Sequence, residues 1–116
     1  MMTDRDLDLS GASRGPILDE VVSRLVPIYH PERIYLFGSA ARGETGPDSD
    51  YDVLVIVPDQ TPPELQRSAP AYEALWGLKA AVDVLVWTRG AFDRRLHLAA
   101  SLPAAVAREG RLLYGA

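Results

Sequence analysis

The sequence predicts an α/β or α+β domain in which helices flank a small mixed β-sheet. Two observations support this: short apolar runs rich in β-forming residues alternate with segments of helical periodicity, and 116 residues is the size of one ordinary domain. Hydrophobic residues make up 47% of the chain and charged residues 24%, as in globular proteins. We expect a single domain over residues 16–116, preceded by a flexible N-terminal arm over residues 1–15, which lacks any periodicity.

The first helix is predicted from Pro16 to about Pro27, where apolar residues recur at helical spacing. Proline suits the first helical position because its missing N–H would have no partner there. Two strands follow, over residues 34–37 (IYLF) and 51–57 (YDVLVIV). Their connection is too short for a full parallel crossover, so we expect them to run antiparallel or to enclose a compact helix.

A second helix is predicted to follow these strands. Thr61 and Glu64 have the spacing of a capping box, and the helix is expected to run toward Leu78 with a kink or restart at Pro70. Residues 82–87 (VDVLVW) then predict the third strand.

The last part of the chain predicts helices and an edge strand. Thr88 is a suitable N-cap for a helix that continues to about Ala99, and Ser101 restarts the helix. Gly110 is expected to end it, and residues 111–114 (RLLY) predict a final edge strand.

Acidic residues stand at the start of two of the predicted strands. Asp50 and Asp52 point to the same face because side chains alternate along a strand, whereas Tyr51 points to the other. Clustered carboxylates repel one another, and their oxygens are preferred ligands of hard cations such as Mg²⁺. Asp83 opens the third strand in the same way. If the two strands are neighbours with Asp83 on the same face, three carboxylates converge and can hold two magnesium ions beside the phosphates of a nucleotide.

The loop before the acids carries residues suited to phosphate. Gly38 lets the backbone pass close to a ligand, Ser39 offers a hydroxyl and an N–H, and the guanidinium of Arg42 can bind phosphate oxygens. Each feature alone has a structural interpretation as a turn, a solvated loop end or a surface charge. Their combination favours phosphoryl transfer.

The stretch FGSAARGETGPDSDYDVLV, residues 37–55, resembles the nucleotidyltransferase superfamily that includes DNA polymerase beta, and specifically its minimal nucleotidyltransferase (MNT) group. A Gly-Ser pair, ten residues and Asp-x-Asp match without a gap, as do the Ala-Arg-Gly and Ser-Asp elements between them. The third aspartate occurs in VDVLV, and EGRLLYG is similar to the group's last strand. The resemblance covers most of the chain from Pro16 onward.

This resemblance implies a polymerase beta-like nucleotidyltransferase fold and roles for the motif residues. Gly38 and Ser39 would hold the β- and γ-phosphates of the nucleotide. Asp50 and Asp52 would ligate both metal ions. Asp83 would ligate one of them and help to activate the attacking hydroxyl, which displaces pyrophosphate from the α-phosphorus.

The resemblance also implies a substrate and a partner. MNT proteins typically pair with a small helical HEPN-type protein, often a toxin RNase, and transfer AMP from ATP to its tyrosine hydroxyl. We therefore expect a Mg²⁺-dependent protein adenylyltransferase that acts as an antitoxin. Two alternatives remain open: an antitoxin that neutralises its partner by contact alone, and a small-molecule adenylyltransferase of the aminoglycoside-modifying kind. The second alternative has less support, because the sequence shows no acceptor domain.

Composition excludes several other classes of function. Twelve basic and sixteen acidic residues give a net charge of −4, so extended nucleic acid is not an expected partner. The absence of cysteine excludes disulfides and thiolate metal sites. No apolar run approaches the ~20 residues of a membrane span, and the first residues lack the features of a signal peptide. We expect a cytoplasmic protein without membrane contact.

The remaining conspicuous side chains have mainly structural interpretations. His30 is expected at the surface or as a helix cap. Four aromatic residues in or beside predicted elements are expected in the core: Tyr35, Phe37, Trp76 and Trp87. A basic cluster is expected to be a solvated helix face, with contact to the partner or the nucleotide as the alternative: Arg89, Arg94 and Arg95. A set of apolar residues suits either the core or partner binding: Leu96, Leu98, Leu102 and Val106.

Overall fold

The computed structural model describes residues 15–38, 40–43 and 50–115 of the chain. Ser39 lies outside the described residues, and so does the predicted N-terminal arm apart from Gly15. The elements are α2 (Pro16–Tyr29), β2 (Arg33–Phe37), β3 (Asp50–Val57), the 3₁₀ turn η1 (Pro63–Leu65), α3 (Ala69–Ala74), β4 (Ala81–Thr88), α4 (Arg89–Arg95), α5 (Leu102–Glu109) and β5 (Arg111–Gly115).

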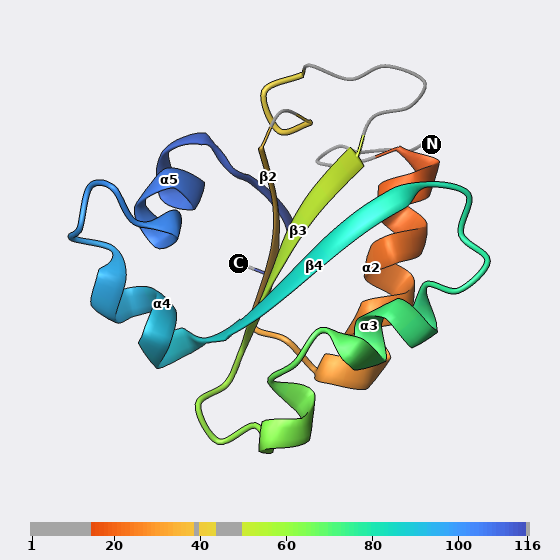
Figure 1. Cartoon of the computed structure of the whole chain (residues 1–116), viewed down its shortest axis with the longest axis horizontal. Coiled ribbons are helices and arrows are strands. Elements are labelled where there is room, and N and C mark those ends of the chain that lie inside the picture. Colours follow the sequence, from red (N-terminus) through yellow and green to blue (C-terminus); the bar gives the residue numbers. More distant parts are fainter. Residues whose placement is uncertain (1–14, 39, 44–49, 116) are drawn as a thin grey trace, which may run out of the picture.

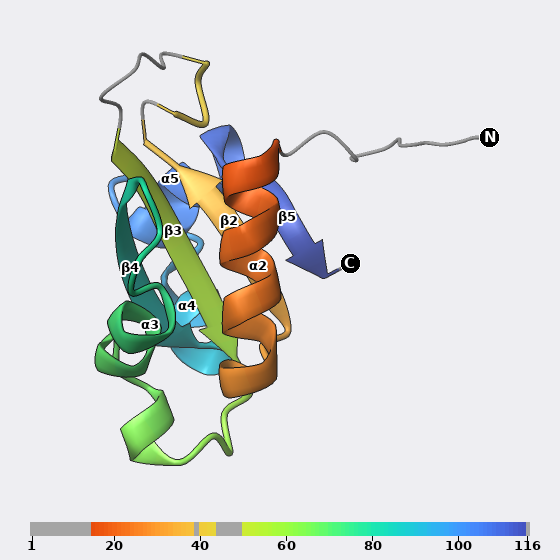
Figure 2. The same cartoon turned by 90° about the vertical axis from the view of Figure 1, so that its right-hand side faces the viewer.

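The strands form a mixed four-stranded sheet in the order β4-β3-β2-β5. β2 runs antiparallel to both β3 and β5, whereas β3 and β4 are parallel and are connected through η1 and α3 (Figure 1). Helices α2 and α3 cover one face of the sheet, and α4 and α5 cover the other (Figure 2). The predicted mixed sheet flanked by helices is confirmed, with the first two strands antiparallel.

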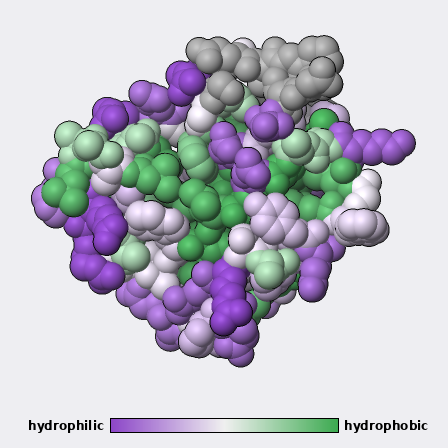
Figure 3. Space-filling view, in the orientation of Figure 1, coloured by the Kyte–Doolittle hydropathy of each residue, from purple (hydrophilic) through white to green (hydrophobic). Residues whose placement is uncertain are grey.

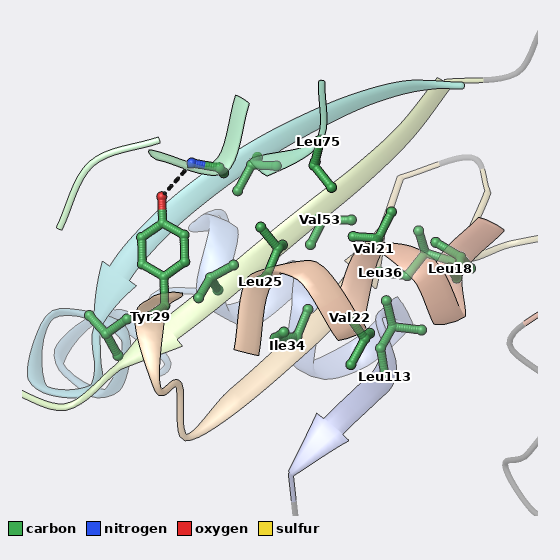
Figure 4. Close-up of a cluster of buried hydrophobic side chains, with 14 of the residues drawn as sticks. Leu18, Val21, Val22, Leu25, Tyr29, Ile34, Leu36, Val53, Leu75 and Leu113 are labelled. Carbon is green, nitrogen blue, oxygen red and sulfur yellow. Dashed lines mark hydrogen bonds between the residues drawn. The ribbon is translucent and has the colours of Figure 1, made fainter. Parts of the chain in front are cut away.

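The larger core lies between the sheet and helices α2 and α3 (Figure 4). Val53, Val55 and Val57 of β3 point into it because alternate residues of a strand face the same side, and all three are inaccessible to solvent. Leu18, Val21 and further residues of α2 meet them at the helical spacing that the sequence displays.

Tyr29, the last residue of α2, links this helix to the chain that enters α3. Its ring is buried, and its hydroxyl donates a hydrogen bond to Arg67 O (2.6 Å) and accepts one from the amide of Ala71 (3.0 Å), which Figure 4 draws. Burial raises the pKa of the Tyr29 hydroxyl, so the group stays protonated and can donate. Without this hydroxyl, Arg67 O would lose this donor, whereas the amide of Ala71 would keep its hydrogen bond to Ser68 O (2.9 Å).

A smaller core fills the opposite side of the sheet. Leu54 and Ile56 of β3 pack there with Phe92 of α4 and Val106 of α5. The ring of Tyr35 stacks on Phe92, with 6.1 Å between the ring centroids. The two cores together leave β3 with alternate residues in two different layers, which decides where the side chains at the start of the strand point.

The first predicted helix is correct in position but extends further than expected. It continues past Pro27 to Tyr29, because a proline in the last turn removes only one backbone hydrogen bond and the buried Tyr29 anchors the end. His30 then ends the helix with φ 46°, and its amide bonds to Val26 O at 2.9 Å. The expectation of a capping role for His30 is confirmed.

The capping box at Thr61 was wrong. Pro62 precedes another proline and adopts an extended conformation with ψ 148°, so no helix can begin at Thr61. A short 3₁₀ turn forms instead, and α3 starts afresh around Pro70, as the restart prediction expected. The helix ends at Ala74, well before Leu78.

The later elements follow the predicted order with shorter helices. The hydroxyl of Thr88 accepts a hydrogen bond from the amide of Ala91, so the predicted N-cap is confirmed. The predicted restart at Ser101 is also confirmed, and its hydroxyl accepts a hydrogen bond from the amide of Ala104. However, α4 ends at Arg95 rather than near Ala99. Gly110 is the C-cap of α5, and the final edge strand β5 is confirmed.

The expectation for the aromatic residues holds for three of the four. The rings of Tyr35, Phe37 and Trp87 pack against the smaller core. Trp76 is 84% exposed, contrary to prediction, because it lies beyond Leu75, the C-cap of α3, and precedes Gly77, whose φ of +85° turns the chain away. Within the described residues, no helix is long and apolar enough to cross a membrane.

Candidate nucleotidyl-transfer site

The three predicted acidic residues lie on two neighbouring strands and on one face of the sheet. In the parallel pair β3–β4, Asp52 stands directly opposite Asp83, and Asp50 precedes Asp52 by two residues. Tyr51 packs against the larger core, so Asp50 and Asp52 face the other side, as expected. The neighbouring strands assumed by the sequence prediction are therefore present.

The same face is covered by helices only along its other half. Leu54 and Ile56 of β3, which follow Asp52 at alternate positions, and Trp87 of β4 pack with α4 and α5. α4 begins where β4 ends (Figure 1), so the helices cover the C-terminal halves of the two strands. The acidic halves remain accessible: Asp50 and Asp83 are exposed and Asp52 is half-buried.

Gly38 lies against the carboxylate of Asp52. Phe37 pairs with Asp52 across β2 and β3, and Gly38 follows it with φ +76°, a backbone conformation that favours glycine. A Cβ atom at position 38 would lie 2.5 Å from Asp52 Oδ2, so any larger residue would displace the carboxylate. The absence of a side chain at Gly38 therefore leaves room for the carboxylate of Asp52.

Partial burial raises the pKa of Asp52, and the like charges of Asp83 and Asp50 raise it further. These like-charge effects show that the three carboxylates share one region. A hard divalent cation would relieve the repulsion, so the residues fit a magnesium ion in their donor chemistry and in their charge.

The folding stability of the protein is expected to depend on this repulsion. Because the pKa of Asp52 is raised in the folded state, ionisation of Asp52 destabilises the fold as pH rises above the ordinary value of 3.8. Asp52→Asn is therefore expected to raise the melting temperature at neutral pH by a few degrees, since relief of surface charge repulsion commonly stabilises by about 0.5–2 kcal/mol.

Thermal melts of both proteins across the acidic range test this expectation. The gain should vanish below pH 3.8, where the carboxyl is protonated in both states. Asp59→Asn, at an exposed aspartate that accepts a hydrogen bond from the amide of Gly90, is the matched control and should give no gain. An Asp52→Asn protein that melts lower than the wild type at neutral pH would contradict the assigned repulsion.

The other predicted site residues are placed less directly. Arg42 follows a turn in which the amide of Ala41 bonds to Gly38 O, and its guanidinium lies 3.5 Å from a carboxylate oxygen of Glu109 at the end of α5. Ser39 lies outside the described residues. Among residues 15–38, 40–43 and 50–115, no three acidic or histidine side chains are grouped tightly enough to form a ready-made metal site.

The structure adds two side chains to this region: Phe37, which the sequence analysis expected in the core, and Leu85. Phe37 lies opposite Asp52 and on the same face, where its ring packs against the smaller core. Leu85 follows Asp83 by two residues on that face and is 42% exposed. The sequence contained a signal for Leu85: it lies two residues after Asp83 on one strand, so alternation places both side chains on the same face.

Comparison with known proteins identifies the class. The family described as "Nucleotidyltransferase domain" matches residues 17–111, so the chain belongs to that family. A search of the curated proteins gave no match. The resemblance to an MNT-type domain with a polymerase beta-like fold, drawn from the motif around Gly38 and Asp52, is thereby confirmed.

Two solved structures share the fold. One is a crystal structure of a toxin–antitoxin with AMP-PNP, at 24% identity and a TM-score of 0.59, covering 85% of this chain and 73% of that one. The other is a protein from Sulfolobus solfataricus described as a nucleotidyltransferase, at 20% identity and a TM-score of 0.56, covering 90% of this chain and 93% of that one. At these identities the likeness concerns the fold.

Proposed function

We propose that this protein is a Mg²⁺-dependent adenylyltransferase that moves AMP from ATP to a tyrosine hydroxyl of a HEPN-type helical toxin and thereby acts as its antitoxin. The observation that carries the proposal is the pairing of Asp52 with Asp83 on adjacent parallel strands, with Asp50 on the same face, in a chain of the nucleotidyltransferase family. This arrangement concentrates carboxylate oxygens at the accessible N-terminal ends of β3 and β4.

The acidic residues have distinct roles in this proposal. Asp50 and Asp52 would hold two magnesium ions, whose positive charge would stabilise the negative charge that develops on the attacking and leaving oxygens. Asp83 would ligate one ion and would accept the proton of the acceptor hydroxyl. The hydroxyl oxygen forms a bond to the α-phosphorus of ATP as the bond to pyrophosphate breaks, so no protein nucleophile is needed.

The loop after β2 binds the nucleotide in the same proposal. The backbone at Gly38, which approaches Asp52 closely, and the hydroxyl of Ser39 contact the β- and γ-phosphates. Arg42 adds a guanidinium, which in this proposal binds a phosphate oxygen. Its exposed ion pair with Glu109, at 3.5 Å, is of a kind that contributes little to stability.

The identity of the partner rests on the likeness to known proteins. A fold neighbour is a toxin–antitoxin crystallised with AMP-PNP, a nucleotide in which nitrogen replaces the oxygen that bridges the β- and γ-phosphates of ATP. The described helices and strands build the sheet and its two cores, which supports an acceptor that is presented by another molecule.

The test is the intact mass of the helical protein encoded beside this one, after incubation with this chain, ATP and Mg²⁺. We expect a mass increase by whole AMP units and none with Asp50→Asn, which keeps the size of the side chain and removes its charge. A stable complex without any mass increase would contradict the transfer and favour an antitoxin that acts by contact alone. An adenylylated aminoglycoside formed by the isolated chain would instead favour the small-molecule alternative.

A further inference from the structure

The outer edge of β4 is only partly closed. β4 is an edge strand of the sheet, with β3 on its other side. The amide of Val84 donates a hydrogen bond to the hydroxyl of Tyr72 (3.2 Å), which shows that this amide points away from β3. Because backbone amides alternate in direction along a strand, the amide of Val86 points to the same open side. No other described residue bonds to it there.

A pocket of about 290 Å³ opens beside this free part of the edge. Its lining combines apolar surface from β4 and α4 with polar groups from the rim: Gln66, Val86, Trp87, Thr88, Ala91 and Arg95. Pockets for whole small molecules span about 300–1,000 Å³, so this one is suited to a single large side chain.

Arg95 supplies a positive charge at the pocket. Its guanidinium lies over the ring of Trp87, 5.8 Å from the ring centroid. Arg89, in contrast, is engaged by Glu32 and Asp93, both at 2.8 Å. In the described part of the chain no carboxylate pairs with Arg95, so its charge is available to a ligand.

Exposed apolar side chains flank the pocket. Leu85 on β4 is 42% exposed, Tyr72 on α3 is 46% exposed, and Leu96 at the end of α4 is 38% exposed. Figure 3 shows green hydrophobic surface in the middle of the molecule, where Figure 1 places β4, interrupted by purple and pale side chains. Apolar surface beside unpaired backbone groups is typical of a site to which an extended chain adds as a further strand.

We propose that the edge of β4 beside this pocket binds an extended acidic segment of the partner protein that carries the acceptor hydroxyl. One large apolar or aromatic side chain of the segment fills the pocket, and a neighbouring carboxylate pairs with Arg95. The backbone of the segment bonds to the free amide of Val86. This proposal rests on the proposed function for the identity of the partner.

Tyr72 argues against a second copy of this chain as the occupant. Pairing of β4 with its own counterpart would need a continuous edge, and the hydroxyl of Tyr72 already occupies the amide of Val84. The hydroxyl of Tyr72 therefore interrupts the edge, and the open stretch around Val86 suits a short segment. The charge of Arg95 favours an acidic segment as the occupant, because a carboxylate complements a guanidinium that no described carboxylate pairs with.

The position of this surface also suits presentation of an acceptor. Trp87 follows Asp83 by four residues on the same strand and face, which corresponds to about 13 Å. A partner held at the pocket therefore has its neighbouring residues within reach of the three acidic side chains.

The test begins with selection from a library of short random peptides against the folded full chain, without nucleotide or Mg²⁺. We expect the selected peptides to combine carboxylates with a large apolar residue. Binding should weaken about tenfold or more with Arg95→Glu, since hydrogen bonds to charged groups are worth that much, and by a similar factor with Ala91→Phe, which fills the pocket. Val86→Pro, which removes the outward amide, should also weaken binding, because proline is tolerated on an edge strand.

Arg108→Glu is the matched control, because Arg108 is an exposed arginine on α5 away from the pocket. It should leave peptide binding unchanged. Selection of no peptide, selection of basic peptides, or binding that Arg95→Glu and Ala91→Phe both leave intact would overturn the proposal.

A second arm separates this proposal from the proposed function. The best selected peptide is added to the transfer reaction with the helical partner and should inhibit it. A peptide that binds in the pocket without inhibiting an active transfer would refute the docking role. If the peptide binds but the protein transfers no AMP to the partner, the proposed function is refuted and the peptide-binding surface is still supported.

Discussion

Replacing Gly38 by alanine is expected to lower the rate of AMP transfer at least about 100-fold. The added Cβ would lie 2.5 Å from Asp52 Oδ2, closer than atoms can approach, so the carboxylate must move. A displacement of about 1 Å in a catalytic group can cost a factor of 100. The rate is measured from the mass increase of the partner with time.

Gly43→Ala separates this effect from backbone strain. Gly43 also has a left-handed conformation, with φ +81°, but among the described residues no atom beyond its chain neighbours lies within 4 Å of the position of its Cβ. Both variants incur the cost of a left-handed alanine, about 1–2 kcal/mol, whereas only Gly38→Ala disturbs Asp52. Similar transfer rates in the two variants would show that the contact between Gly38 and Asp52 is not what the site requires.

Asp83→Asn is expected to slow the transfer by about 10²–10⁴-fold, the range lost when a general base is removed. Asp83 stands opposite Asp52 but on the edge strand, and it is the more exposed of the two. We therefore expect the affinity for ATP to fall less with Asp83→Asn than with Asp52→Asn, since Asp52 is proposed to hold both metal ions. Transfer rates and titration with ATP in the presence of Mg²⁺ measure the two effects.

Asp93→Asn is the control for Asp83→Asn. Asp93 is exposed on α4 and pairs with Arg89 in an i,i+4 ion pair, which is worth only a few tenths of a kcal/mol. Its loss should leave both the transfer rate and the affinity for ATP unchanged. A transfer rate that survives Asp83→Asn would remove this residue from the proposed chemistry and leave Asp50 and Asp52 alone at the site.

Local rules were sufficient for much of the fold and for part of the site. Alternation along β3 predicted that Asp50 and Asp52 share a face, because the period of a strand is a property of the backbone itself. The N-cap at Thr88 and the helix restart at Ser101 were predicted from equally local signals, and each hydroxyl accepts a hydrogen bond from an amide three residues away. Interactions this short depend little on the rest of the chain.

Local rules failed where neighbouring residues compete. Thr61 has the spacing of a capping box, but the consecutive prolines after it impose an extended backbone. Trp76 was expected in the core on the strength of its ring, yet the end of α3 and the turn at Gly77 leave it 84% exposed. Burial depends on where a helix stops, which a single residue type does not reveal.

The amino-acid sequence by itself determined the strand that carries Asp50 and Asp52, the glycine before the loop, and the family motif that joins them. Only the tertiary structure decided that β4 lies beside β3 in parallel, with Asp83 opposite Asp52 and Gly38 against the same carboxylate. Strand pairing joins residues about thirty positions apart, and its free energy comes from packing both faces of the sheet, which no local pattern contains.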